Sequence, residues 1–160
     1  MARPTLYVET TIPSYLASRP SRDVIVLAHQ QITAEWWTTR RLAFDLRVSE
    51  LVILEAGRGD PELARARREF LDGIPLLDAS SQVGSLAEKY VTELQIPEQA
   101  RNDAVHLAFA TVHEVDYLLT WNCAHLANAV VRRKFQKLNG ALRLSSPTIC
   151  TPEELLESLP

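Results

Sequence analysis

The chain has 160 residues, of which 46% are hydrophobic and 23% are charged, so it is long enough to form one globular domain with a full core. Its formal net charge of -3 excludes a general attraction to nucleic acid, so any site for a polyanion must be a local patch. The two cysteines, Cys123 and Cys150, form no CxxC unit, which argues against a zinc site and favours reduced thiols.

Strand-like and helix-like segments alternate along the chain. The predicted strands are residues 5–8, 44–48, 74–77, 116–121 and 148–150. The predicted helices are a short turn from Pro13, residues 23–42 with Ser21 as cap, a segment capped by Ser49 and ended by Gly57, residues 61–73, 81–94, 97–114 and 124–138, and a terminal helix from the capping box of Thr151 and Glu154. This alternation predicts one α/β domain over residues 1–160, a three-layer α/β/α sandwich with a mainly parallel central sheet.

The N-terminal segment lacks the charged and apolar regions of a signal peptide, and Glu9 falls where the apolar region would lie. No uninterrupted apolar run approaches the roughly 18 residues that a membrane span needs. We therefore expect a cytoplasmic protein with no membrane partner.

Four acidic or amide side chains stand where strands end or where the chain is otherwise apolar. They are Glu9, Glu55, Asp103 and Asn122. An unpaired carboxylate is costly in such surroundings, so each needs a cation, a donor or a shifted pKa. Ligands of parallel α/β sheets bind beyond the carboxyl ends of the strands, where Glu9 and Asn122 are expected. A shared Mg²⁺ or Mn²⁺ would satisfy the three carboxylates best, since hard cations prefer oxygen ligands.

Each of these positions also has a plainer explanation. Glu9 fits a strand-end charge that points to water, while Glu55 and Asp103 fit solvent-exposed helix faces. Asp116 fits a turn residue before its strand, and it is also a candidate metal ligand. His106, three residues after Asp103 on the same helix face, fits a hydrogen-bonded core histidine better than a metal ligand.

Hydroxyl and basic side chains near the acids are candidates for RNA contacts. The hydroxyl candidates are Thr10, Thr11 and Ser14, and the basic candidates are Arg132, Arg133 and Lys134. Hydroxyls directly after Glu9 suit a phosphate or a metal-bound water. The basic run would hold a nucleic-acid backbone, although such a run is also typical of a solvated helix face.

The adjacent residues Trp36 and Trp37 point about 100° apart if the segment is helical. Both indoles are therefore not expected in the core of a small domain. Exposed tryptophan is enriched at interaction sites, so we expect one indole in a subunit or partner interface. The predicted assembly is a homodimer, because two-fold dimers are the commonest assembly.

Four segments together resemble the PIN-domain family, and specifically the VapC-like toxins of type II toxin–antitoxin pairs. They are residues 7–15, 49–55 with Gly59 and Asp60, 102–108, and 116–122. The resemblance implies a three-layer α/β/α fold, RNA cleavage with Mg²⁺ or Mn²⁺ held by acids, and a cognate antitoxin. It assigns catalytic positions to Glu9, Glu55, Asp103 and Asn122. Glu9 replaces an aspartate of the family pattern and Asn122 replaces an acid, which leaves Asp116 to compensate for the lost charge.

The sequence therefore predicts a metal-dependent endoribonuclease, the toxin of a toxin–antitoxin pair. The alternative is a catalytically degenerate PIN module that binds RNA or a partner protein without cleavage, which Glu9 and Asn122 favour. A metal-dependent phosphatase on another α/β fold has less support, because the chain has no phosphate-binding loop or aspartyl nucleophile motif.

Overall fold

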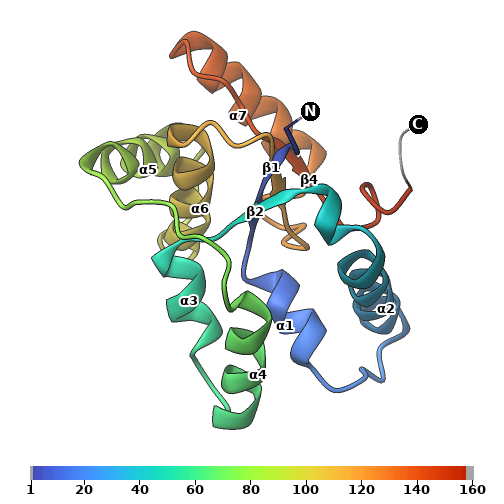
Figure 1. The fold of residues 1–160 in the computed structure, drawn as a ribbon. Coiled ribbons are helices and arrows are strands. Elements are labelled where there is room, and N and C mark those ends of the chain that lie inside the picture. Colours follow the sequence, from blue (N-terminus) through green and yellow to red (C-terminus); the bar gives the residue numbers. More distant parts are fainter. Residues whose placement is uncertain (1, 158–160) are drawn as a thin grey trace.

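A four-stranded parallel sheet forms the middle layer of the structure, a computed structural model that describes residues 2–157 (Figure 1). The strand order is β2-β1-β3-β4, and all three neighbouring pairs are parallel. The strands are β1 Thr5–Val8, β2 Asp45–Arg47, β3 Tyr117–Leu119 and β4 Thr148–Cys150. The predicted α/β fold with a parallel central sheet between helical layers is confirmed.

Seven α-helices surround the sheet in the described part of the chain. They are α1 Thr11–Ala17, α2 Val24–Thr39, α3 Glu50–Ala56, α4 Pro61–Leu71, α5 Ser81–Glu93, α6 Arg101–Val112 and α7 Ala129–Ala141. Short 3-10 turns at Arg41–Ala43 and Glu98–Ala100 precede β2 and α6. Ser49 caps α3 by accepting a hydrogen bond from the Val52 N–H, as the sequence predicts.

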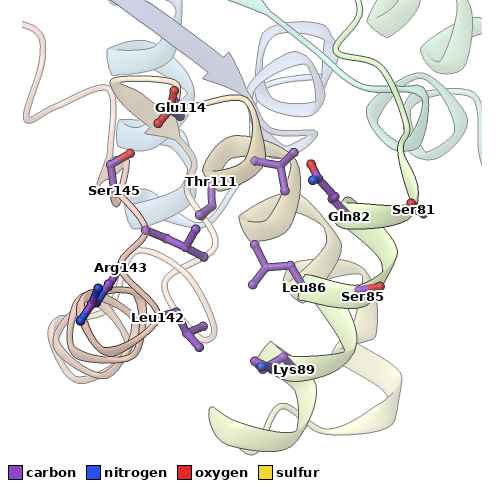
Figure 2. A pocket seen from close by; sticks show the side chains of 12 residues that line it. Ser81, Gln82, Ser85, Leu86, Lys89, Thr111, Glu114, Leu142, Arg143 and Ser145 are labelled. Atoms are coloured by element: carbon purple, nitrogen blue, oxygen red, sulfur yellow. The ribbon is translucent and has the colours of Figure 1, made fainter.

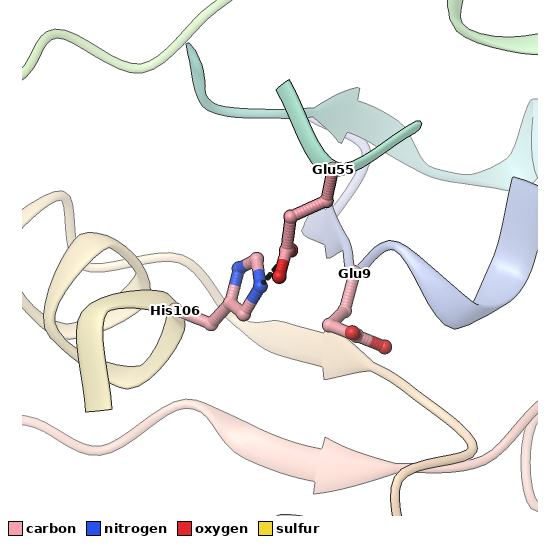
Figure 3. A group of neighbouring side chains, drawn as sticks. All are labelled: Glu9, Glu55 and His106. Atoms are coloured by element: carbon pink, nitrogen blue, oxygen red, sulfur yellow. Dashed lines mark hydrogen bonds and ion pairs between the residues drawn. The ribbon is translucent and has the colours of Figure 1, made fainter. Parts of the chain in front are cut away.

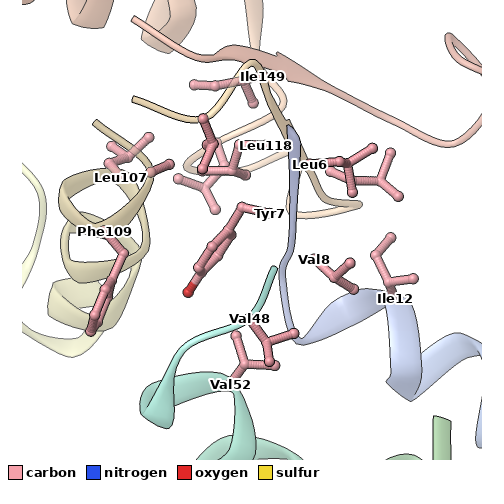
Figure 4. Packing of buried hydrophobic residues seen from close by; sticks show 14 of the residues in the cluster. Leu6, Tyr7, Val8, Ile12, Val48, Val52, Leu107, Phe109, Leu118 and Ile149 are labelled. Carbon is pink, nitrogen blue, oxygen red and sulfur yellow. The ribbon is translucent and has the colours of Figure 1, made fainter. Parts of the chain in front are cut away.

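The core occupies both faces of the sheet. Leu6, Tyr7 and Val8 of β1 are all fully buried, as expected for the central strand of a parallel sheet covered on two sides. Tyr7 points toward α6, whereas Leu6 and Val8 point to the opposite face, where Ile12 of α1 packs (Figure 4). This alternation places the Tyr7 hydroxyl on the face that carries α6.

Two helix starts depart from the prediction, one in the identity of its cap and the other in its position. Asp23, not Ser21, caps α2, since its Oδ1 accepts hydrogen bonds from the N–H groups of Ile25 and Val26. The basic helix α7 begins at Ala129, five residues later than predicted, after the cap Asn128.

Two predicted elements do not form regular structure. Residues 74–77 contribute a single parallel bridge between Leu76 and Val48 instead of a strand. After β4, Thr151 and Glu154 exchange the hydrogen bonds of a capping box, yet residues up to 157 form turns rather than an α-helix.

The expectation of an exposed indole is wrong. Trp36 is 0% exposed and Trp37 is 9% exposed. Phe70 of α4 packs edge-on against Trp37 at 5.9 Å, and the Arg41 guanidinium lies 5.4 Å from the centroid of the same indole. Phe70 and Arg41 therefore cover the indole that was expected to face a partner, and the homodimer prediction loses its structural argument.

Both cysteines are free thiols, Cys123 on the surface and Cys150 in the core. Burial raises the pKa of the Cys150 thiol to about 12, so this sulfur stays protonated at neutral pH. Among residues 2–157, no helix combines the length and the apolar character that crossing a membrane requires.

Candidate metal centre

Three elements bring Glu9, Glu55 and His106 together (Figure 3). Glu9 is the first residue after β1, Glu55 lies in the last turn of α3, and His106 lies in the middle of α6. One ligand atom from each of the three side chains lies within 4.8 Å of the other two. The three residues form a mostly buried cluster with the composition and spacing to hold a metal ion.

The Glu9 carboxylate is 4% exposed, and its two oxygens have different surroundings. Oε2 accepts hydrogen bonds from the Thr11 N–H at 3.0 Å, the Thr11 hydroxyl at 2.6 Å and the Thr120 hydroxyl at 2.8 Å. Oε1 has no hydrogen-bond partner among residues 2–157 and is not among the fully buried unpaired atoms, so it reaches solvent. The protein therefore positions one oxygen of Glu9 and leaves the other available to a ligand.

The Glu55 carboxylate is half-buried and is held by three side chains. Its Oε1 accepts hydrogen bonds from the Thr10 hydroxyl at 2.6 Å and from His106 Nε2 at 2.7 Å, and its Oε2 accepts a longer one from Asn102 at 3.4 Å. Burial raises the pKa of Glu55, but the hydrogen bond and charge of His106, together with the bonds from Thr10 and Asn102, lower that pKa below its ordinary value. Glu55 is consequently ionised at neutral pH.

The imidazole of His106 is 1% exposed and uses both of its nitrogens. Nε2 bonds to Glu55, and Nδ1 shares a 2.7 Å hydrogen bond with the Tyr7 hydroxyl, which bonds in turn to the Ser49 hydroxyl at 2.7 Å. Burial lowers the pKa of His106, but the bond to Glu55 and the surrounding carboxylates raise it above its ordinary value. The prediction of a hydrogen-bonded core histidine is confirmed.

Asp103 lies one helical turn before His106 on α6, but its carboxylate is not in the group of mutually close ligand atoms. Its Oδ2 instead bonds to His125 Nδ1 at 3.0 Å. The Asp103 charge still contributes to the raised pKa of His106, so the residue acts electrostatically on the cluster. The predicted convergence therefore holds for Glu9 and Glu55, and His106 takes the third place.

Asn122 organises the chain after β3. Its side-chain oxygen accepts a hydrogen bond from the His125 N–H at 3.1 Å, and its backbone oxygen accepts from Leu126 and Ala127. These bonds form a turn between β3 and α7, so that α7 begins only at Ala129, and they place His125 beside Asp103. Asn122 thus shapes the loop that follows β3 and is linked to Glu9 through the Thr120 hydroxyl.

Asp116 lies at the wrong end of the sheet to bind the same ion. Its Oδ2 accepts hydrogen bonds from the Thr5 N–H at 2.7 Å and the Thr5 hydroxyl at 2.9 Å. The register pairs Leu6 with Tyr117, so Asp116 and Thr5 stand before the amino ends of their strands, whereas Glu9 follows the carboxyl end. The assignment of Asp116 as a metal ligand is wrong, and the turn interpretation is correct.

Two of the three hydroxyl groups that were predicted to contact RNA bond to protein carboxylates in the structure. Thr10 and Thr11 donate to the site carboxylates, so their hydroxyl protons position Glu55 and Glu9. Ser14 lies half-buried on the next turn of α1.

The three residues of the basic run have different surroundings. Arg132 forms an ion pair with Glu154 at 3.1 Å, and Arg133 is exposed on α7. Lys134 lines a cavity of about 160 Å³ together with His125, the residue that holds Asp103. A cavity thus connects the basic run, through Lys134, to the histidine that binds Asp103.

A larger cavity of about 520 Å³ opens between α5, α6 and the segment that follows α7 (Figure 2). Leu86, Val112 and Leu142 line its apolar part, and Lys89 and Arg143 supply its positive charge. No residue of the acidic cluster or of the predicted RNA contacts lines this cavity. The acidic cluster and the cavity are separate features of the molecule.

Sequence reasoning missed Thr120, which is fully buried and connects two parts of the site. Its hydroxyl donates to Glu9 Oε2 at 2.8 Å and accepts from the Asn122 N–H at 2.9 Å. A hydroxyl in an otherwise apolar strand end, directly before Trp121 and Asn122, was the available signal.

Replacing Thr120 with the isosteric valine should lower the free energy of unfolding by about 1–3 kcal/mol, because it leaves the Asn122 N–H without a partner. Urea denaturation in the presence of chelator measures this loss. Thr120→Ser keeps the hydroxyl and is the matched control. A Thr120→Val protein as stable as the wild type would show that these bonds contribute nothing.

Comparisons with known proteins provide no family assignment, since no protein-family model and no curated protein match this chain. The function is therefore inferred from the geometry of the site.

Proposed function

We propose that this protein is a metal-dependent endoribonuclease of the PIN-like kind, which hydrolyses RNA phosphodiester bonds. The observation that supports the proposal best is the meeting of Glu9 and Glu55, far apart in sequence, beyond the carboxyl end of β1. This edge of a parallel α/β sheet is where ligands bind in such folds. The resemblance of the four sequence segments to VapC-like toxins supports the choice of RNA as substrate.

The atoms available in the cluster fit Mg²⁺ or Mn²⁺. Glu9 Oε1 has no hydrogen-bond partner among residues 2–157, and Glu55 is ionised, so both offer the oxygen ligands that hard cations prefer. The nitrogens of His106 are already bonded to Glu55 and Tyr7, so this residue suits the orientation of Glu55 better than direct ligation. A divalent ion held there would polarise a phosphate and lower the pKa of a bound water.

The chain's own residues would keep this site in shape. Thr11 and Thr120 fix the rotamer of Glu9 through its Oε2, and Thr10 with His106 fixes Glu55. Because these hydrogen bonds fix both side chains, binding of a cation would require little reorganisation of the carboxylates.

The same hydrogen bonds give the alternative its support. Protein donors hold one oxygen of Glu9 and both oxygens of Glu55, and Asn122 supplies no charge, so a binding module without cleavage would have a stable site. Such a degenerate PIN module would bind RNA or a partner protein.

Cleavage of labelled RNA separates the two functions. The wild-type protein should cut RNA endonucleolytically with Mg²⁺ or Mn²⁺, and a chelator should stop the reaction. The Asn122→Asp variant restores the acid of the family pattern. If the wild type is inert with both metals while Asn122→Asp cuts, the natural protein is the binding module.

A cognate antitoxin is the protein partner that the resemblance implies, and we include it in the proposal. A small DNA-binding protein encoded in the adjacent reading frame, which co-purifies with this chain and inhibits it, would support this assignment. Neither indole is exposed at a surface that could form a dimer interface. The homodimer therefore stays a prediction, which light scattering can test.

A further inference from the structure

Three aromatic side chains form a cluster near Glu9, in which two rings are stacked and the third is tilted against both. His29 of α2 lies parallel to the Trp121 indole, with 4.0 Å between ring centroids and an interplanar angle of 12°. Tyr15 of α1 lies 6.4 Å from each of these rings. Trp121 is buried and its indole N–H donates to the Thr33 hydroxyl at 2.7 Å, so the innermost ring is fixed. Tyr15 and His29 are only half-buried and present part of their surface to solvent.

Short hydrogen bonds connect this stack to Glu9. The backbone N–H of Trp121 donates to the Thr11 hydroxyl oxygen at 2.8 Å, and the Thr11 hydroxyl donates in turn to Glu9 Oε2 at 2.6 Å. Tyr15 follows Thr11 by four residues on α1, so both side chains lie on the same helix face. The solvent-facing rings therefore belong to the same edge of the molecule as the candidate metal site.

The loop between α1 and α2 carries two arginines. Arg19 and Arg22 are exposed, and neither forms an ion pair within residues 2–157. Gln30, the neighbour of His29, holds the loop in place, since its amide donates to the Arg19 backbone oxygen at 3.0 Å and its Oε1 accepts from the Ser21 N–H at 2.9 Å. The loop that carries these two exposed cations is thus tied to the residue after His29, in a protein whose overall charge is negative.

We propose that Tyr15 and His29 form a stacking subsite for a nucleobase of single-stranded RNA, with Arg19 and Arg22 contacting the adjoining phosphates. The identity of the nucleic acid rests on the proposed function. Aromatic rings next to cations are the combination that binds single strands, because every base has a π-face and every nucleotide has a phosphate. The subsite positions a substrate strand across the Glu9 and Glu55 carboxylates.

The test measures RNA affinity in a background that does not cleave. The probe is a short fluorescein-labelled single-stranded RNA, and its dissociation constant is measured by anisotropy for Glu55→Gln alone and combined with a Tyr15 substitution. Tyr15→Leu keeps apolar volume but has no π-face, whereas Tyr15→Phe keeps the ring. Since base stacking on an aromatic ring contributes about 1–3 kcal/mol, Tyr15→Leu should weaken binding by about 5- to 150-fold and Tyr15→Phe should preserve it.

A labelled strand made of abasic nucleotides is the control for a purely structural role of Tyr15. The subsite predicts that Tyr15→Leu leaves the affinity for this strand unchanged, while Arg19→Ala weakens both strands and lowers the salt dependence. Equal losses for the natural and abasic strands would overturn the subsite, as would no loss for either.

Failure of the stacking subsite and failure of the ribonuclease proposal give different results in these experiments. If the wild type cuts RNA and Tyr15→Leu binds as tightly as its parent, the subsite is wrong and the ribonuclease proposal stands. If Tyr15→Leu selectively weakens binding of the natural strand but the wild type cuts with neither metal, the subsite stands and cleavage is wrong. If the Glu55→Gln parent binds neither strand, the subsite is overturned directly.

Discussion

The Glu55→Gln substitution should lower metal-stimulated RNA cleavage by at least about 100-fold while the fold stays intact. Glutamine matches the size of glutamate and still accepts hydrogen bonds from Thr10 and His106, so the local structure has partners for its oxygen. It removes the negative charge, however, and with it most of the attraction for a divalent cation. The measurement is the initial rate of cleavage of labelled RNA at saturating Mn²⁺, with far-ultraviolet circular dichroism to check the fold.

Glu50→Gln is the matched control for this experiment. Glu50 lies in the first turn of the same helix, α3, and its side chain is exposed. Its substitution removes the same charge from the same element and should leave the rate within about two-fold of wild type, since exposed charges interact weakly through water. A Glu55→Gln enzyme with wild-type activity would show that Glu55 holds no catalytic ion.

The second large effect is expected on stability. His106→Ala should lower the free energy of unfolding by about 2–4 kcal/mol in chelator, because it opens a cavity in the core and removes a partner from Tyr7 and Glu55. The Tyr7 phenol stays protonated, since burial raises its pKa well above the ordinary value, and it keeps only its bond to Ser49. Urea denaturation followed by tryptophan fluorescence measures the change.

His106→Gln separates the hydrogen bonds from the cavity, since its amide retains a donor toward Glu55 and fills part of the space. It should recover a measurable part of the lost stability. If alanine at position 106 costs less than about 0.5 kcal/mol, which is typical of surface substitutions, then the bonds to Tyr7 and Glu55 do not stabilise the fold.

The features that sequence reasoning predicted correctly depend on local signals. The apolar run of β1 and the cap of α3 by Ser49 each need only a few adjacent residues. The start of α4 likewise follows from Asp60 and Pro61, where a capping side chain precedes a residue suited to the first helical turn. The carboxyl-end position of Glu9 follows from the alternation of strands and helices, because that alternation predicts a parallel sheet.

The features that were predicted wrongly depend on register and on distant packing. Asp116 was expected to compensate for the acid that Asn122 lacks, but the pairing of Leu6 with Tyr117 puts it at the amino end of its strand. Trp37 is buried because α4 covers it, and no short segment contains that information. His106 joins the cluster through its contacts with β1 and α3, which the spacing to Asp103 along α6 does not reveal.

Direct binding of Mn²⁺ to the metal-free protein tests whether Glu9 and Glu55 form a divalent-cation site. Calorimetric titration should show one ion per chain for the wild type and a loss of binding for Glu9→Gln, which keeps the side-chain size but removes the charge of the free Oε1. At an ion concentration of about 100 times the dissociation constant, binding should stabilise the wild type by about 2.7 kcal/mol, enough to raise its melting temperature by roughly 5–10 °C. A wild-type protein that binds no Mn²⁺, or a Glu9→Gln protein that binds it equally well, would contradict the account.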